Sequence, residues 1–140
     1  MHIMRDTISI KYYRLEENMY NEFEAWLDAA LEGGVPEDVA AFNFNLYEDD
    51  DNLWSIELIG ASRFDPEDPD WACDEVFTNR EDPLCWSAET DWEEVLETMT
   101  QYVEKYLEDG EYAPVLKDSE AVGIGFVDGD ITIVYVNAEA

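Results

Sequence analysis

Acidic residues dominate this chain: thirty-six aspartates and glutamates stand against seven lysines and arginines, which gives a formal charge of -29 in 140 residues. Net charge on this scale is also a mark of disordered chains, because like charges oppose compaction. Apolar residues make up 46% of the sequence and aromatic residues 14%, however, and disordered acidic tails lack such content. The sequence therefore predicts a compact, folded body with a strongly negative exterior.

The chain has the length of one domain of ordinary size, which can fold without a metal or a disulfide. We therefore expect a single domain over residues 1–140. No apolar run approaches the roughly 18 residues of a membrane span, and the first ten residues lack the apolar core of a secretory signal. These features predict a cytoplasmic, bacterial-type protein in which Cys73 and Cys85 stay reduced, a disulfide between them being the less favoured alternative.

Two segments have the three- and four-residue spacing of apolar side chains that is typical of amphipathic helices. The first covers residues 15–32 and ends at Gly33–Gly34, where glycine can adopt the left-handed conformation of a helix end. The second covers residues 91–109, starts with capping-box spacing between Thr90 and Glu93, and ends at a glycine. The expected apolar stripes are Met19, Tyr20, Phe23, Trp26, Leu27, Ala30 and Leu31 in the first helix, and Trp92, Val95, Leu96, Met99, Tyr102, Val103, Tyr106 and Leu107 in the second.

Alternating apolar and polar residues predict two hairpins of antiparallel strands. In the first hairpin the alternation covers residues 42–46 and 54–58, and acidic turn residues join the two strands. In the second, residues 122–126 lead through the tight-turn pair Asp128–Gly129 into residues 131–136. The last of these strands is apolar on both faces, which is typical of an interior strand.

Weaker signals complete the expected fold. Gly123 and Gly125 lie inside a strand and suggest a bulge or a close approach of another backbone. Residues 1–13 suggest one more strand, and the proline-rich segment 61–89 suggests a short strand at residues 74–78. Together these elements predict an α+β domain with a mainly antiparallel sheet and two amphipathic helices packed on one face.

Residues that perform catalysis or hold metals are scarce in this sequence. The one histidine, His2, lies at the terminus, and no Ser-His-Asp or Cys-His site can be assembled without it. The phosphate-binding motifs GxxxxGK[ST] and GxGxxG do not occur, and the acidic stretches that start at Asp49, Asp65 and Asp128 fail the EF-hand spacing. We therefore expect no catalytic residue, metal or cofactor, although the composition is compatible with paired carboxylates for glycoside hydrolysis.

Acidic clusters and the tryptophans beside them are the candidate binding residues. A single cluster is usually a solvated loop, but a formal charge of -29 exceeds what solubility needs. Trp71 and Trp86 lie among acids outside any regular pattern, so they are either plugs at the edge of the core or partly exposed interface anchors. The candidate partner-binding residues are Glu48, Asp49, Asp50, Asp51, Asp65, Glu67, Asp68, Asp70, Trp71, Asp74, Glu75, Glu81, Asp82 and Trp86.

Three stretches in the second half of the chain carry a family resemblance: Asp70–Phe77, the helix from Trp92 to Leu107, and the ending Val122–Asp130. They resemble bacterial immunity proteins of polymorphic-toxin and contact-dependent inhibition systems. This resemblance implies a cytoplasmic protein that neutralises one cognate toxin, frequently a nuclease. The charge agrees, because a negative protein is drawn to basic surfaces and is repelled by nucleic acids and anionic membranes. We therefore expect a basic protein partner, and neither a nucleic-acid nor a membrane partner.

Three other interpretations stay open. A mimic of nucleic acid would use the same charge against DNA- or RNA-binding proteins, but it should space its carboxylates regularly, whereas this sequence clusters them in loops. A protein from a salt-loving cell would be acidic through adaptation and would need molar salt to fold. An enzyme is the least favoured interpretation, because only carboxylates are available as catalytic groups.

Overall fold

The computed structural model describes the backbone of residues 8–138 and the side chains of residues 19–138. His2 lies outside the described residues. The elements, in chain order, are α1 (Ile8–Glu32), β1 (Ala41–Asp50), β2 (Leu53–Ala61), the short 3-10 helix η1 (Pro69–Cys73), β3 (Glu75–Thr78), β4 (Leu84–Ser87), α2 (Trp92–Asp109), α3 (Ala113–Lys117), β5 (Ala121–Phe126) and β6 (Thr132–Val136).

The strands form one sheet in the order β3-β2-β1-β5-β6, and β4 pairs with the same edge of β2 as β3 does, nearer the start of β2. Among the strands described, only β1 and β5 pair in parallel; the other pairings are antiparallel. The predicted α+β class with a mainly antiparallel sheet is therefore confirmed. The parallel pair joins the two predicted hairpins at the centre of the sheet, where both strands are largely buried.

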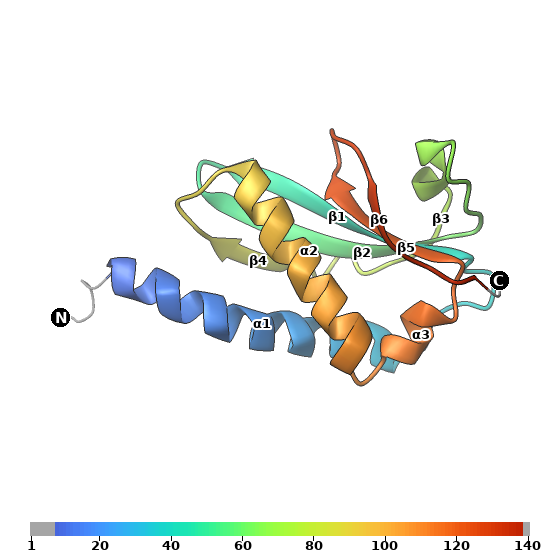
Figure 1. Ribbon diagram of the computed structural model, residues 1–140, viewed down its shortest axis with the longest axis horizontal. Helices are drawn as coiled ribbons and strands as arrows, with labels where there is room; N and C mark the ends of the chain where they lie inside the picture. Colours follow the sequence, from blue (N-terminus) through green and yellow to red (C-terminus); the bar gives the residue numbers. More distant parts are fainter. Residues whose placement is uncertain (1–7, 139–140) are drawn as a thin grey trace.

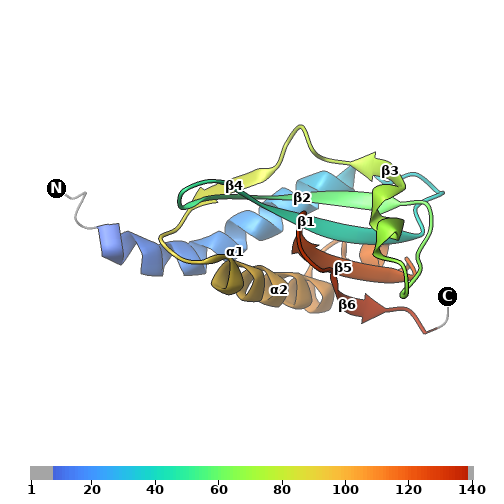
Figure 2. The same ribbon diagram turned by 90° about the horizontal axis from the view of Figure 1, so that it is seen from above.

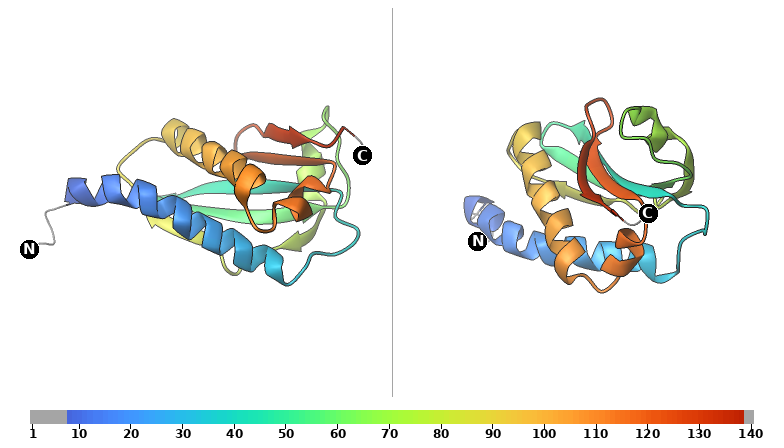
Figure 3. Two further views of the ribbon diagram at one scale, coloured as in Figure 1. Left: turned by 60° about the horizontal axis from the view of Figure 1, so that its bottom comes forward. Right: turned by 45° about the vertical axis from the view of Figure 1, so that its right-hand side comes forward.

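Helices α1 and α2 cover one face of the sheet, as predicted, and the short α3 follows α2 at the same level (Figure 1; Figure 3). Phe42, Phe44 and Leu46 on β1 point into this layer because they alternate along the strand, and all three are fully buried. Tyr106 on α2 ties the two helices together, since its hydroxyl donates a hydrogen bond to the carboxylate of Asp28 at 2.6 Å. The core therefore lies between the helices and the sheet.

The opposite face of the sheet is covered at one end by η1 and the loop around it (Figure 2). Trp71 of η1 is 1% exposed and packs with small and branched side chains of the central strands, among them Ala41, Ile59 and Ala121. Phe64 lies edge-on to the Trp71 ring, with the ring centroids 5.2 Å apart. This second small core fixes the acidic segment that follows β2 onto the sheet.

Several local predictions are confirmed. The hairpins β1–β2 and β5–β6, helix α2 and the short strand β3 lie where the sequence placed them. The close approach of another backbone is confirmed at Gly125, where a Cβ would clash with the carbonyl oxygen of Asp130. At Gly123 a Cβ would instead meet side chains, 2.6 Å from Oδ1 of Asn43. The ladder between β5 and β6 shifts register at Gly123, which is the predicted bulge.

Other predictions are wrong. Residues 8–13 belong to α1 and form no strand, because the helix begins at Ile8; residues 1–7 lie outside the described part. Strand β6 is an edge strand and not an interior one, since nothing in the described chain pairs with its far side. The N-cap of α2 is Asp91, whose carboxylate accepts from the backbone N–H of Glu94 at 2.9 Å, one residue beyond the predicted capping box.

Candidate protein-binding surface

Trp92 is a large apolar side chain that the fold leaves at the surface. It is the first residue of α2, it is 53% exposed, and its ring lies edge-on to Phe126 at a centroid distance of 6.2 Å. Helical spacing places Trp92 on the same stripe as Val95, but Val95 is 3% exposed and Trp92 lies one turn before the buried part of the helix. The side chain predicted to enter the core is therefore available to a partner.

Two hollows in the surface meet at Trp92. One has a volume of about 470 Å³ and is lined by Leu46, Tyr47, Glu48, Trp92, Phe126, Val127, Asp128 and Gly129. The other has a volume of about 590 Å³ and is lined by Trp92, Glu93, Leu96, Glu97, Thr100, Gln101, Glu104 and Thr132. The residues that line these two hollows are called the Trp92 surface below. Its apolar centre consists of Trp92 and its neighbours Phe126 and Val127, and Val127 is itself 53% exposed.

Carboxylates surround this apolar centre. The acidic residues of the Trp92 surface are all exposed, and none of the described residues that line the two hollows is basic: the acids are Glu48, Glu93, Glu97, Glu104 and Asp128. An exposed indole beside unpaired carboxylates is suited to a cation, because the ring face attracts positive charge and the carboxylates neutralise it. The Trp92 surface can therefore accommodate a cationic side chain.

Basic side chains elsewhere do little to offset the acidic exterior. Of the thirty-two acidic residues whose side chains are described, twenty-seven are exposed. Arg63 is ion-paired with Asp68 and Asp74, and Arg80 with Glu57 and Glu75. The ammonium of Lys105 lies over the ring of Tyr20, 4.3 Å from its centroid. The excess of negative charge is therefore presented to solvent and to any partner.

The predicted partner-binding acids do not form one surface. Glu48–Asp51 lie at the turn between β1 and β2, at one end of the sheet, and residues 65–70 lie around η1 at the opposite end (Figure 2). Glu81 and Asp82 lie on the connection between β3 and β4, where the backbone carbonyl of Asp82 accepts from the indole N–H of Trp26 at 2.8 Å. Only the β1–β2 turn contributes to the Trp92 surface, through Glu48.

Some of the predicted acids have structural roles instead. Asp68 caps η1 by accepting from the backbone N–H of Asp70, and it also pairs with Arg63. Asp65 accepts from the backbone N–H of Glu67 at 2.9 Å, which holds the turn before η1. These carboxylates order the loop that covers the second core, and they face a cation or an N–H group of their own chain.

The two predicted tryptophan anchors are placed differently. Trp71 is buried beneath η1, so the anchor interpretation is wrong for this residue and the plug interpretation is right. Trp86 on β4 is half-buried and packs against the main core, opposite Trp54 in the register of β2 and β4. Trp92 was missed because periodicity assigns a residue to a face of a helix and does not show where the core ends along that face.

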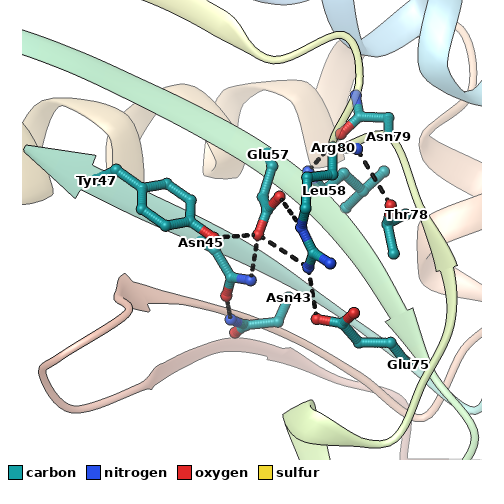
Figure 4. A network of polar contacts seen from close by, with 9 residues as sticks. All are labelled: Asn43, Asn45, Tyr47, Glu57, Leu58, Glu75, Thr78, Asn79 and Arg80. Carbon is teal, nitrogen blue, oxygen red and sulfur yellow. Dashed lines mark hydrogen bonds and ion pairs between the residues drawn. The ribbon is translucent and has the colours of Figure 1, made fainter. Parts of the chain in front are cut away.

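A buried carboxylate, that of Glu57, is the centre of a polar network that includes Tyr47, a residue of the Trp92 surface (Figure 4). Glu57 on β2 is 1% exposed and accepts hydrogen bonds from Arg80 Nε at 2.8 Å, Asn45 Nδ2 at 2.8 Å and the Tyr47 hydroxyl at 2.6 Å. Burial alone would raise the pKa of Glu57, but the hydrogen bonds from Arg80, Asn45 and Tyr47 outweigh it and hold the pKa below its ordinary value of 4.5. Glu57 is therefore an ionised, fully engaged side chain and not a base poised for catalysis.

The network continues from Glu57 in two directions. The amide nitrogen Nδ2 of Asn43 donates a hydrogen bond to Oδ1 of Asn45 at 2.7 Å. The amide oxygen of Asn43 itself, Oδ1, is buried and has no hydrogen-bond partner among the described residues. Burial and the hydrogen bond to Glu57 raise the pKa of Tyr47 to about 12, so its hydroxyl stays a donor at neutral pH. Because Tyr47 also lines the smaller hollow, the network holds one wall of the Trp92 surface in place.

No metal centre is found among the described residues, because no group of three or more His, Cys, Asp or Glu side chains there is placed so that it could hold a metal ion. Cys73 and Cys85 are free and exposed. Within the described part of the chain, none of the helices has the length and apolarity needed to cross a membrane. The chain matches no protein-family model, and it matches no curated protein and no solved structure.

Proposed function

We propose that this protein binds and neutralises a basic protein, as a bacterial immunity protein does for its cognate toxin, by covering the partner's active or substrate-binding surface in the cytoplasm. The observation that supports the proposal is the unbalanced exterior: twenty-seven described carboxylates are exposed, while both described arginines are ion-paired within the molecule. Such a negative field speeds encounter with a cationic protein and repels nucleic acid.

A nuclease is the partner class that fits this charge best. Enzymes that act on nucleic acid hold the phosphates in basic grooves, and an acidic body that occupies such a groove excludes the substrate without performing chemistry. The acidic exterior and the exposed ring of Trp92 support this choice, because occlusion needs complementary charge and large side chains at the contact.

Affinity capture followed by an activity assay tests the proposal. The purified chain is immobilised, a lysate of its source cell is applied at low salt, and bound proteins are released with a salt gradient. We expect one basic protein to elute, to lose its activity when mixed with an equal amount of this chain, and to associate more slowly as salt screens the charges. A captured protein that keeps its full activity in the complex contradicts neutralisation, and an association rate indifferent to salt contradicts the electrostatic argument.

Nucleic-acid mimicry is the second candidate, and one observation favours it. Glu93, Glu97, Glu104 and Glu108 are all exposed on α2. At a rise of about 1.5 Å per residue these positions form a row with steps of roughly 6 to 10 Å along the helix. A mimic should inhibit several unrelated DNA-binding proteins, whereas an immunity protein should inhibit only its cognate toxin, so a panel of such proteins separates the two candidates.

A further inference from the structure

We infer that the Trp92 surface is the docking site for an arginine-bearing segment of the basic partner, with a guanidinium placed against the Trp92 indole and between the flanking carboxylates. This inference rests on the proposed function and assigns its contact surface. The arguments are the exposure of Trp92, the hollows on either side of it, and the charge around them.

The exposure of Trp92 needs a partner to explain it. A tryptophan that is 53% exposed and next to an equally exposed valine, Val127, leaves apolar area in water on a protein that otherwise buries its large rings well. Tryptophan is enriched among the residues that contribute most to binding at protein interfaces, and a concave site allows a partner side chain to be desolvated there. Trp92 lines both hollows, so a partner side chain in either of them can reach it.

The charge around Trp92 selects the occupant. Glu48 and Asp128 line the smaller hollow, and Glu93 and Glu97 line the larger one. A second copy of this chain would bring its own formal charge of -29 and would be repelled, and so would nucleic acid or an anionic membrane. Arginine fits better than lysine, because its planar guanidinium can stack on an indole and donate to carboxylates on both sides at once.

The rim carboxylates are free to receive such a cation. No described side chain of the protein donates a hydrogen bond to Glu48 or Asp128, in contrast to Asp74 and Glu75, which are paired with arginines. The wall behind them is held by the hydrogen bond from Tyr47 to Glu57. A docked guanidinium would therefore gain ion pairs without breaking any that the described residues make with Glu48 or Asp128.

A hexa-arginine peptide with blocked ends is the probe for the test, with hexa-citrulline as a neutral peptide of nearly the same shape. Binding is measured by calorimetry at low salt for the wild type and for two charge-matched double variants. Glu48→Gln with Asp128→Asn removes two charges from the Trp92 surface, and Glu67→Gln with Asp70→Asn removes two exposed charges at the opposite end of the molecule. Thermal unfolding confirms that each variant is folded.

We expect the Glu48/Asp128 variant to bind hexa-arginine about tenfold more weakly than the Glu67/Asp70 variant. Trp92→Leu should also weaken binding by about tenfold, while Trp92→Phe, which keeps a ring face, should lose less. In an NMR spectrum of the indole N–H groups, the signal missing from the Trp92→Phe variant should be the one that shifts when the peptide is added.

Three results would overturn the inference, and they have different meanings for the proposed function. Equal weakening by both double variants, with no effect of Trp92→Leu, would show a diffuse field and would leave the proposed function intact. Equal binding of hexa-citrulline would show that the hollows take an apolar or neutral ligand. Failure of hexa-arginine to bind the wild type at low salt would overturn the docking site, whereas the proposed function would be overturned only if the affinity capture also returned no basic protein.

Discussion

Arg80 donates two hydrogen bonds to Glu57, from Nε to Oε1 at 2.8 Å and from Nη2 to Oε2 at 3.3 Å, although half of the arginine side chain is exposed and the carboxylate is buried. The same guanidinium also pairs with Glu75 at 2.7 Å. A side chain from the loop after β3 therefore stabilises an ionised carboxylate beneath it on β2. Without that cation the buried charge would be opposed only by the dipoles of Asn45 and Tyr47.

Replacing Arg80 with alanine should destabilise the protein by about 2 kcal/mol. Removal of one partner of a buried pair costs more than this, but the half-exposed position of Arg80 reduces the effect. Arg63→Ala is the matched control, because the side chains of its acidic partners Asp68 and Asp74 are 44% and 47% exposed and the change should be near the limit of detection. Urea unfolding of the two variants measures the difference, and equal losses would show that burial of Glu57 adds nothing to the Arg80 pair.

The contribution of Glu57 to stability should depend on pH. Its pKa is held below the ordinary value of 4.5, so the folded state favours the ionised form, and the resulting stability is present above pH 4.5 and is lost as pH falls through the pKa of the folded state. Glu57→Gln removes this dependence. The difference in free energy of unfolding between wild type and Glu57→Gln should therefore stay constant from pH 7 to about pH 4.5 and shrink as pH is lowered further toward the pKa of the folded state. A difference that stays constant below pH 4.5 as well would contradict the lowered pKa.

Trp71 and Trp92 should differ in their contributions to stability, in the opposite sense to the sequence pattern. Trp71 lies among acids but is buried, whereas Trp92 lies on an apolar helix stripe but is exposed. Trp71→Ala should cost about 3–5 kcal/mol, because it empties the second core beneath η1. Trp92→Ala should cost about 1 kcal/mol or less, since a half-exposed ring loses mainly its contact with Phe126. Thermal or urea unfolding decides the matter, and a Trp92 variant as unstable as the Trp71 variant would place Trp92 in the core after all.

The close approach of the segment before β6 to Gly125 of β5 predicts a steric effect. Gly125→Ala should destabilise the protein by about 2 kcal/mol, because the new methyl group would meet the rigid backbone carbonyl of Asp130. Gly33→Ala adds the same methyl group where no atom lies within 4 Å and φ is not positive, and it should change stability by no more than about 0.5 kcal/mol. Equal unfolding midpoints for the two variants would mean that the β5–β6 hairpin moves to accept a side chain at Gly125.

Local patterns predicted most of the secondary structure and much less of its arrangement. The alternation around Phe44 and the helical spacing around Val103 identify buried faces, because burial on one side imposes the period directly. The pattern of β6 could not show that this strand lies at an edge, since strand order depends on the parallel pairing of β1 with β5 across a long connection. The run 131–136 is apolar on both sides because each side packs against a core: Ile131 and Ile133 pack against the second core, and Val134 and Tyr135 pack against the main core.

The candidate site shows the same limit. Acidic residues could be counted from the sequence, but whether a given acid is paired depends on where the arginines lie in space. Asp74 and Asp128 look alike in the sequence, yet Asp74 is bound by Arg63, whereas Asp128 lines a hollow in which none of the described lining residues is basic. Trp92 is exposed because the first turn of α2 extends past the edge of the core. The spacing of apolar residues along the helix does not show where the core ends.

Salt should stabilise this protein over a narrow range of concentration. Twenty-seven described carboxylates are exposed, and their mutual repulsion opposes the compact state. Because the screening length falls from about 30 Å at 0.01 M to about 8 Å at 0.15 M, most of the gain in the free energy of unfolding should be complete by physiological ionic strength. Urea unfolding in sodium chloride measures this, and sucrose, which stabilises without screening charge, is the control.

The outcome of the salt experiment also separates an acidic surface that serves binding from one that reflects adaptation to brine. The buried core on both faces of the sheet, with Trp54, Trp71 and Tyr106 almost fully enclosed, is sufficient for the chain to fold in ordinary buffer. We therefore expect a cooperative unfolding transition at low salt. A chain that stays unfolded until molar salt is added would instead assign the charge to salt adaptation, and the acidic exterior would then no longer support a basic partner.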